Sequence, residues 1–84
     1  MSDQALMRHA VDEMLDAQLA RGDPPEVRAT LVRLERAGYS HDAARNFVAC
    51  ILTVEMRDVI DHRRRFDLAR YLDNLARLPR LPGE

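Results

Sequence analysis

Glu55 and Gln18 are the residues whose positions most suggest chemistry, because each continues a stripe of apolar residues at helical spacing. The apolar residues that define the stripes are Met7, Val11 and Met14 before Gln18, and Val48 and Ile51 before Glu55. We therefore expect both side chains to face inward. A buried, ionised carboxylate without a partner is costly. Glu55 should therefore meet an arginine, Tyr39, Tyr71, Gln18 or a backbone N–H.

Two roles remain open for a buried Glu55. The favoured one is a polar tie, shared with Gln18, that fixes how the helices pack. The alternative is a small-ligand or metal site in which Glu55 acts with His9, Glu13 or His41. His9 and Glu13 have the i, i+4 spacing at which one helix face can chelate an ion. No His-x3-His or Glu-x2-His pair, as di-iron bundles use, occurs elsewhere in the chain, so we expect no metal and no cofactor.

Motifs that would indicate catalysis are absent from the sequence. There is no Gly-x-Ser-x-Gly elbow, no glycine-rich phosphate loop and no cysteine beside a histidine motif. Cys50, the only cysteine, precedes Ile51 in an apolar run, and we expect it to pack as a small buried hydrophobe. The sequence therefore predicts a protein that is not an enzyme.

The elements that must position these residues are helices, because apolar residues recur at every third or fourth position and no strand-like alternation appears. The predicted helices cover residues 4–21, 25–37, 41–61 and 67–77. The expected N-caps are Ser2 or Asp3, Asp23, Ser40 and Asp67, and the expected terminating glycines are Gly22 and Gly38. The fold class is all-α: one domain over 1–84, an antiparallel bundle or orthogonal array around a central helix 41–61. Residues 79–84 contain two prolines and should form an extended tail.

Composition restricts the class of protein further. The chain has 84 residues, 46% hydrophobic and 32% charged, which is typical of one small folded domain. No uncharged run approaches a membrane span, and the first ten residues lack the pattern of an export signal, so we expect a cytoplasmic protein that binds no membrane. The net charge of -1 disfavours nonspecific binding to nucleic acid.

Residues 34–46 resemble a helix-turn-helix, with Gly38 in the turn and His41, Asp42 and Arg45 opening the second helix. This segment is the basis of a nucleic-acid-binding alternative. Against it, the second helix becomes apolar after residue 46, and Asp42 would face phosphates. The same turn also resembles a ubiquitin-associated domain, although the helix 41–61 is too long for that fold.

Arg63, Arg64 and Arg65 form a basic connection between the last two predicted helices and could meet an acidic partner. Phe66 should anchor this connection to the core. The helix 41–61 is more apolar than one small bundle needs to bury. We therefore expect a non-catalytic module that binds an unknown protein or oligomerises, with a homodimer as the simplest assembly.

Several short segments together resemble a family of short bacterial all-helical proteins of unknown function. The matching segments include Gln18-Leu19-Ala20, Gly22-Asp23-Pro24-Pro25-Glu26, Arg33-Leu34, Gly38-Tyr39-Ser40, Ala44, Glu55, Phe66-Asp67, Arg70-Tyr71 and Leu78-Pro79. The resemblance covers most of the chain, and Asp23-Pro24-Pro25-Glu26 is its best single mark. It implies a helical fold and a bacterial, cytoplasmic origin, and it supplies no reaction, cofactor or catalytic residue.

Overall fold

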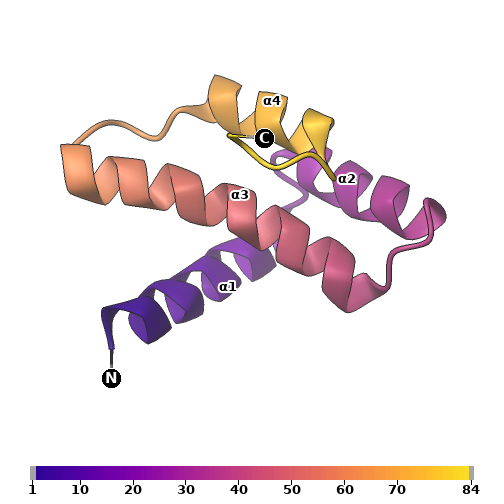
Figure 1. The fold of residues 1–84 in the computed structure, drawn as a ribbon, viewed down its shortest axis with the longest axis horizontal. Helices are drawn as coiled ribbons and strands as arrows, with labels where there is room; N and C mark the ends of the chain where they lie inside the picture. The colour runs from indigo at the N-terminus through magenta and orange to yellow at the C-terminus, as the bar shows by residue number, and fades with distance from the viewer. Residues whose placement is uncertain (1, 84) are drawn as a thin grey trace.

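The computed structural model describes residues 2–83, and it consists of four helices joined by short connections (Figure 1). Their bounds are α1 Asp3–Arg21, α2 Pro25–Arg36, α3 His41–His62 and α4 Leu68–Arg77. No strand occurs within the described residues. The all-α prediction is confirmed, and every predicted helix boundary lies within one residue of the observed one.

Local capping explains why three of the helices begin where they do. Ser2, Ser40 and Asp67 each accept a hydrogen bond from the backbone N–H three residues further on, at 2.9–3.1 Å. The prediction for α2 was wrong. Its N-cap is Pro24, which has no side-chain acceptor, so Asp23 lies one residue too early to cap the helix. Pro25 still suits the first helical position, because its fixed φ is that of a helix.

Helix α3 is the central element, as predicted, since it packs against each of the other three helices. In Figure 1 it crosses the molecule between α1 and α4. The core is built from the inward stripes of all four helices. Its fully buried members include Leu15, Val27, Leu34, Ala44, Val48, Ile51, Leu52, Tyr71 and Leu75.

The end of α4 is tied to α2 by Arg33. Its guanidinium donates to the carbonyl oxygens of Leu78 at 2.7 Å and Leu75 at 3.0 Å, which satisfies acceptors that the helix leaves open. Residues 79–83 then form turns, and Leu81 packs against the core. This segment therefore differs from the extended tail expected from its prolines, because Leu81 gains apolar contact by folding back.

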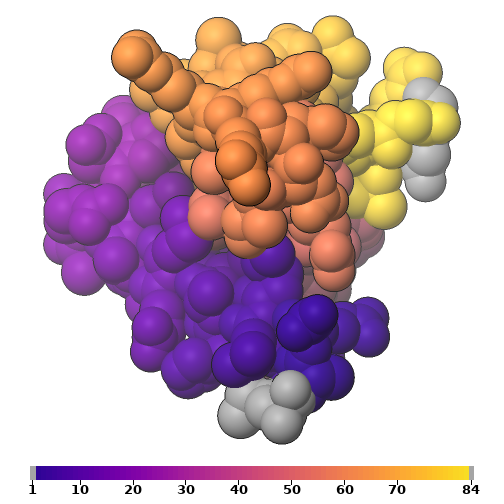
Figure 2. Space-filling view, turned by 90° about the vertical axis from the view of Figure 1, so that its left-hand side faces the viewer, coloured from indigo at the N-terminus to yellow at the C-terminus, as the bar shows by residue number. Residues whose placement is uncertain are grey.

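The bundle leaves some of its apolar surface uncovered. Val54 and Ile60 on α3 are 43% and 57% exposed, and Leu6 on α1 is 52% exposed. Figure 2 views the end of the molecule at which α1 begins, with the first turns of α1 in indigo below the segment that follows α3. None of the described helices is long and apolar enough to cross a membrane.

Candidate functional site

Glu55 lies fully buried on α3 and pairs with Arg70 of α4 in a two-point ion pair. The Arg70 Nε donates to Glu55 Oε2 at 2.8 Å, and Nη2 donates to Oε1 at 2.9 Å. The prediction that Glu55 faces inward is confirmed, and its partner is of the expected kind. This geometry suits the planar guanidinium, whose two parallel N–H bonds match the carboxylate.

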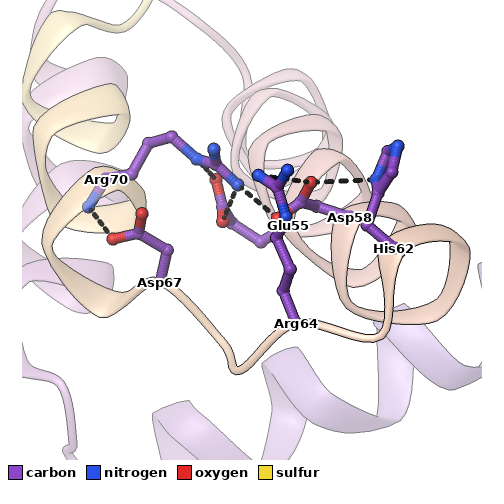
Figure 3. Close-up of polar contacts among 6 residues, drawn as sticks. All are labelled: Glu55, Asp58, His62, Arg64, Asp67 and Arg70. Atoms are coloured by element: carbon purple, nitrogen blue, oxygen red, sulfur yellow. Dashed lines mark hydrogen bonds and ion pairs between the residues drawn. The ribbon is translucent and has the colours of Figure 1, made fainter.

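The ion pair continues toward the surface as a small network of charges, shown in Figure 3. Arg70 Nη2 also donates to Asp58 Oδ2 at 3.0 Å. The other oxygen of Asp58 lies 3.1 Å from His62 Nδ1 and 3.8 Å from Arg64 Nη1. In this way α3, the connection after it and α4 are joined through one aspartate.

The network changes the acidity of its members in opposite directions. The hydrogen bonds that Arg70 donates to Glu55 and Asp58 raise the pKa of Arg70, so its guanidinium stays charged. The hydrogen bond from Arg70 lowers the pKa of Asp58 below its ordinary 3.8, with smaller contributions from the charges of Arg64, Arg70 and His62. Both carboxylates are thus engaged by cations of the chain itself.

The lowered pKa of Asp58 predicts a loss of stability in acid. A carboxyl group with a lowered pKa in the folded state stabilises it above its unfolded pKa, about 3.9, and this contribution disappears as the pH falls through the folded value. Asp58→Asn should therefore unfold at a lower urea concentration than the wild type at pH 7. This difference in midpoint urea concentration should disappear below about pH 4.

Urea unfolding followed by circular dichroism across this pH range measures the difference. Asp73→Asn is the matched control, because Asp73 forms only an exposed i, i+4 pair with Arg77 and should change stability little at any pH. If the midpoint urea concentrations of Asp58→Asn and the wild type differed by the same amount down to pH 3, this explanation would be contradicted.

Gln18 forms a second buried polar contact, separate from Glu55. Its Oε1 accepts a hydrogen bond from the hydroxyl of Tyr71 at 2.8 Å, which links α1 to α4. Burial raises the pKa of Tyr71 to about 12. The Tyr71 ring also meets Phe66 edge-on, with ring centres 5.4 Å apart, and this contact anchors the connection after α3 as predicted.

The residues proposed to complete a ligand or metal site with Glu55 are not brought together. His9 and Glu13 contact each other at 3.1 Å, and both side chains are largely exposed. His41 lies 3.5 Å from Glu35. Over residues 2–83, no group of three or more His, Cys, Asp or Glu side chains is placed to hold a metal ion.

The helix-turn-helix-like segment 34–46 directs its polar side chains toward carboxylates of the chain. Arg45 forms an ion pair of 2.7 Å with Asp16 and also approaches Asp12 at 3.9 Å. Both aspartates lie on α1, so α1 flanks the start of α3. A phosphate approaching Arg45 would meet these negative charges, which disfavours this segment as a nucleic-acid surface.

The basic connection contains three exposed arginines with different local roles. Arg63 ends α3 in the left-handed conformation, with φ of 51°. Arg64 points toward Asp58, whereas Arg65 has no polar partner in the described part of the chain. All three arginines thus remain at the surface, and Arg64 also takes part in the network around Asp58.

A groove between α1 and α3 is a feature that the sequence did not predict. It has a volume of about 950 Å³ and is lined by the first half of α1 and the middle of α3. Its lining is apolar in part, including Met7, Val11, Ala49 and Val54, and polar in part, including Arg8, Asp12, Arg45, Asn46, Thr53 and Arg57. This shape can receive a helix or an extended apolar segment.

Cys50 lies in this groove and is exposed, so the prediction that it packs as a buried hydrophobe was wrong. The physical reason is the position of α1, which covers only one flank of α3. Cys50 and Val54 lie on the uncovered flank, one turn apart. The apolar character of α3 around residues 47–54 therefore serves two surfaces, the core and the groove.

Comparison with known proteins supplies no relative for this chain. No protein-family model, curated protein or solved structure matches it.

Proposed function

We propose that the protein is a non-catalytic interaction module whose α1–α3 groove binds a helix of a partner protein. One observation carries this proposal: the groove combines apolar lining with exposed side chains such as Val54, Cys50 and Arg57. An uncovered apolar depression on a small domain is typical of an interaction surface.

The helical nature of the partner follows from the walls of the groove. The helices α1 and α3 form those walls, and a third helix can lay its apolar i, i+3, i+4 and i+7 side chains between them. Val54 on one wall and Met7 on the other offer contacts for such side chains. Binding would bury surface of α3 that the isolated bundle leaves in water.

The non-catalytic part of the proposal is supported by how the buried polar groups are used. Glu55 is paired with Arg70, and Gln18 with Tyr71. Over the described residues, no buried side-chain nitrogen or oxygen lacks a hydrogen-bond partner. A free thiol at Cys50 suits a reducing compartment, so we place this module in the cytoplasm.

The groove can be tested with a display library of amphipathic helices about 18 residues long, roughly 27 Å, with leucines fixed at helical spacing. The other positions are drawn equally from Glu, Gln, Lys and Arg. Selection on the wild-type protein is expected to enrich binders. Cys50→Trp places a large side chain in the groove, and it should weaken those binders about tenfold or more.

Val32→Trp is the matched control. Val32 is 40% exposed on α2 and does not line the groove, so this variant adds the same ring elsewhere. It should bind like the wild type. Failure to enrich any binder, or binders that ignore Cys50→Trp when circular dichroism shows it folded, would contradict the proposed function.

A further inference from the structure

We propose that the helix bound in the groove is acidic and that its carboxylates pair with Arg8 and Arg57. This inference rests on the proposed function and specifies the chemistry of the partner. Arg8 comes from the α1 wall and Arg57 from the α3 wall, so the two guanidinium groups flank whatever lies between them.

The side chains of Arg8 and Arg57 have no polar partner within the described chain, a property they share with Arg21, Arg36, Arg63 and Arg65, which lie outside the groove. Arg45, the third arginine of the groove, pairs with Asp12 and Asp16. By contrast, Arg8 and Arg57 make no ion pair or hydrogen bond in residues 2–83. Both guanidinium groups are therefore available to a bound molecule.

The charge of the groove opposes that of the whole protein. The groove contains three arginines and one aspartate, whereas the full chain carries a net charge of -1. An acidic helix would therefore be attracted to the groove.

The start of α1 adds to this preference. Ser2 and Ala5 line the groove at the N-terminal end of a 19-residue helix. The positive end of the helix dipole lies there, and it favours negative charge within the first turn. It acts in the same direction as Arg8 and Arg57.

The composition of the selected library tests this inference separately from the proposed function. Binders selected on the wild type should be enriched in Glu over Lys and Arg. Selection on Arg8→Gln/Arg57→Gln should still yield binders and should lose that enrichment. Exposed ion pairs are weak, so acidic binders should bind the double variant about tenfold less tightly. The difference should shrink at high salt.

Arg36→Gln/Arg65→Gln is the matched control, because it removes two exposed arginines outside the groove and changes net charge equally. It should retain the preference for Glu. Binders without excess Glu, or an equal loss in the control, would overturn the acidic-helix proposal and leave the groove itself in place. A complete absence of binders would instead overturn the proposed function.

A second copy of this chain is the competing occupant of the groove. Because the proposal assigns the groove to a different protein, native mass spectrometry of the wild type should show a monomer in place of the homodimer expected from the sequence. A dimer that dissociates in Cys50→Trp and persists in Val32→Trp would assign the groove to another copy and overturn the proposal of an acidic partner protein.

Discussion

Removing the arginine that pairs with Glu55 is expected to produce a large loss of stability. In Arg70→Met, the Glu55 carboxylate stays fully buried on α3 and loses both of its hydrogen bonds. An unpaired buried carboxylate lowers the free energy of unfolding by about 3–5 kcal/mol. The lower end is expected here, because the outer side of Arg70 is 40% exposed and water can reach the vacated space.

A double-mutant cycle separates this cost from the intrinsic value of the ion pair. Glu55→Leu/Arg70→Met removes both charges, and it should regain most of the stability lost in Arg70→Met. Arg77→Met is the control, since Arg77 pairs only with exposed Asp73. Urea unfolding at pH 7 measures the wild type, Glu55→Leu, Arg70→Met, the double variant and the Arg77→Met control. If Arg70→Met lowered the free energy of unfolding as little as Arg77→Met does, the buried ion pair would not connect α3 to α4 as described.

The second large effect concerns Tyr71 at alkaline pH. Because burial raises the pKa of Tyr71 to about 12, the unfolded chain loses its phenolic proton first, at about pH 10. Stability that is fully present below pH 10 is therefore lost as the pH rises toward 12. Two pKa units correspond to about 3 kcal/mol of unfolding free energy.

Tyr71→Phe should remove this alkaline loss, with a cost of about 1 kcal/mol at pH 7 because Gln18 loses its hydrogen bond. Tyr39→Phe is the control, since Tyr39 packs edge-on against Phe47 and makes no contact with Gln18. It should retain the alkaline loss. Urea unfolding followed by circular dichroism at pH 7 to 12 gives the comparison. If the free energy of unfolding of Tyr71→Phe fell with pH as it does in the wild type, the loss would not come from Tyr71.

The fold could be read from the sequence because its signals are local. Apolar spacing, the Ser40 and Asp67 caps and the Gly22 and Gly38 stops each depend on a few neighbouring residues. The inward orientation of Glu55 is local in the same sense, because it follows from the periodicity of one helix. These inferences needed no knowledge of how the helices pack.

The partners of the buried polar groups depended on packing and were harder to predict. Arg70 lies fifteen residues after Glu55 on another helix, and Tyr71 lies 53 residues after Gln18. Choosing these pairs requires the positions of α3, α4 and α1 in space. The sequence limited the possible partners of Glu55 to a few residue types, and the packing of α4 against α3 determines that the partner is Arg70.

The groove was missed for the same reason. The sequence indicated that the helix 41–61 is more apolar than one small bundle needs to bury, but it did not say which flank stays open, and Cys50 was expected in the buried part. The crossing of α1 leaves that flank open. An apolar excess on a central helix predicts burial, but it does not say whether the covering surface belongs to the same chain.

The reactivity of Cys50 gives the most direct test of the groove as a binding site. Cys50 is the only thiol of the protein and lies in the groove, so its reaction with dithionitrobenzoate reports occupancy without any mutation. We expect a saturating amount of a library-selected helix to slow this reaction about tenfold or more, and to leave the helical content unchanged. If the helix binds and the rate at Cys50 is unaffected, the partner lies elsewhere and the α1–α3 groove is not the interaction surface.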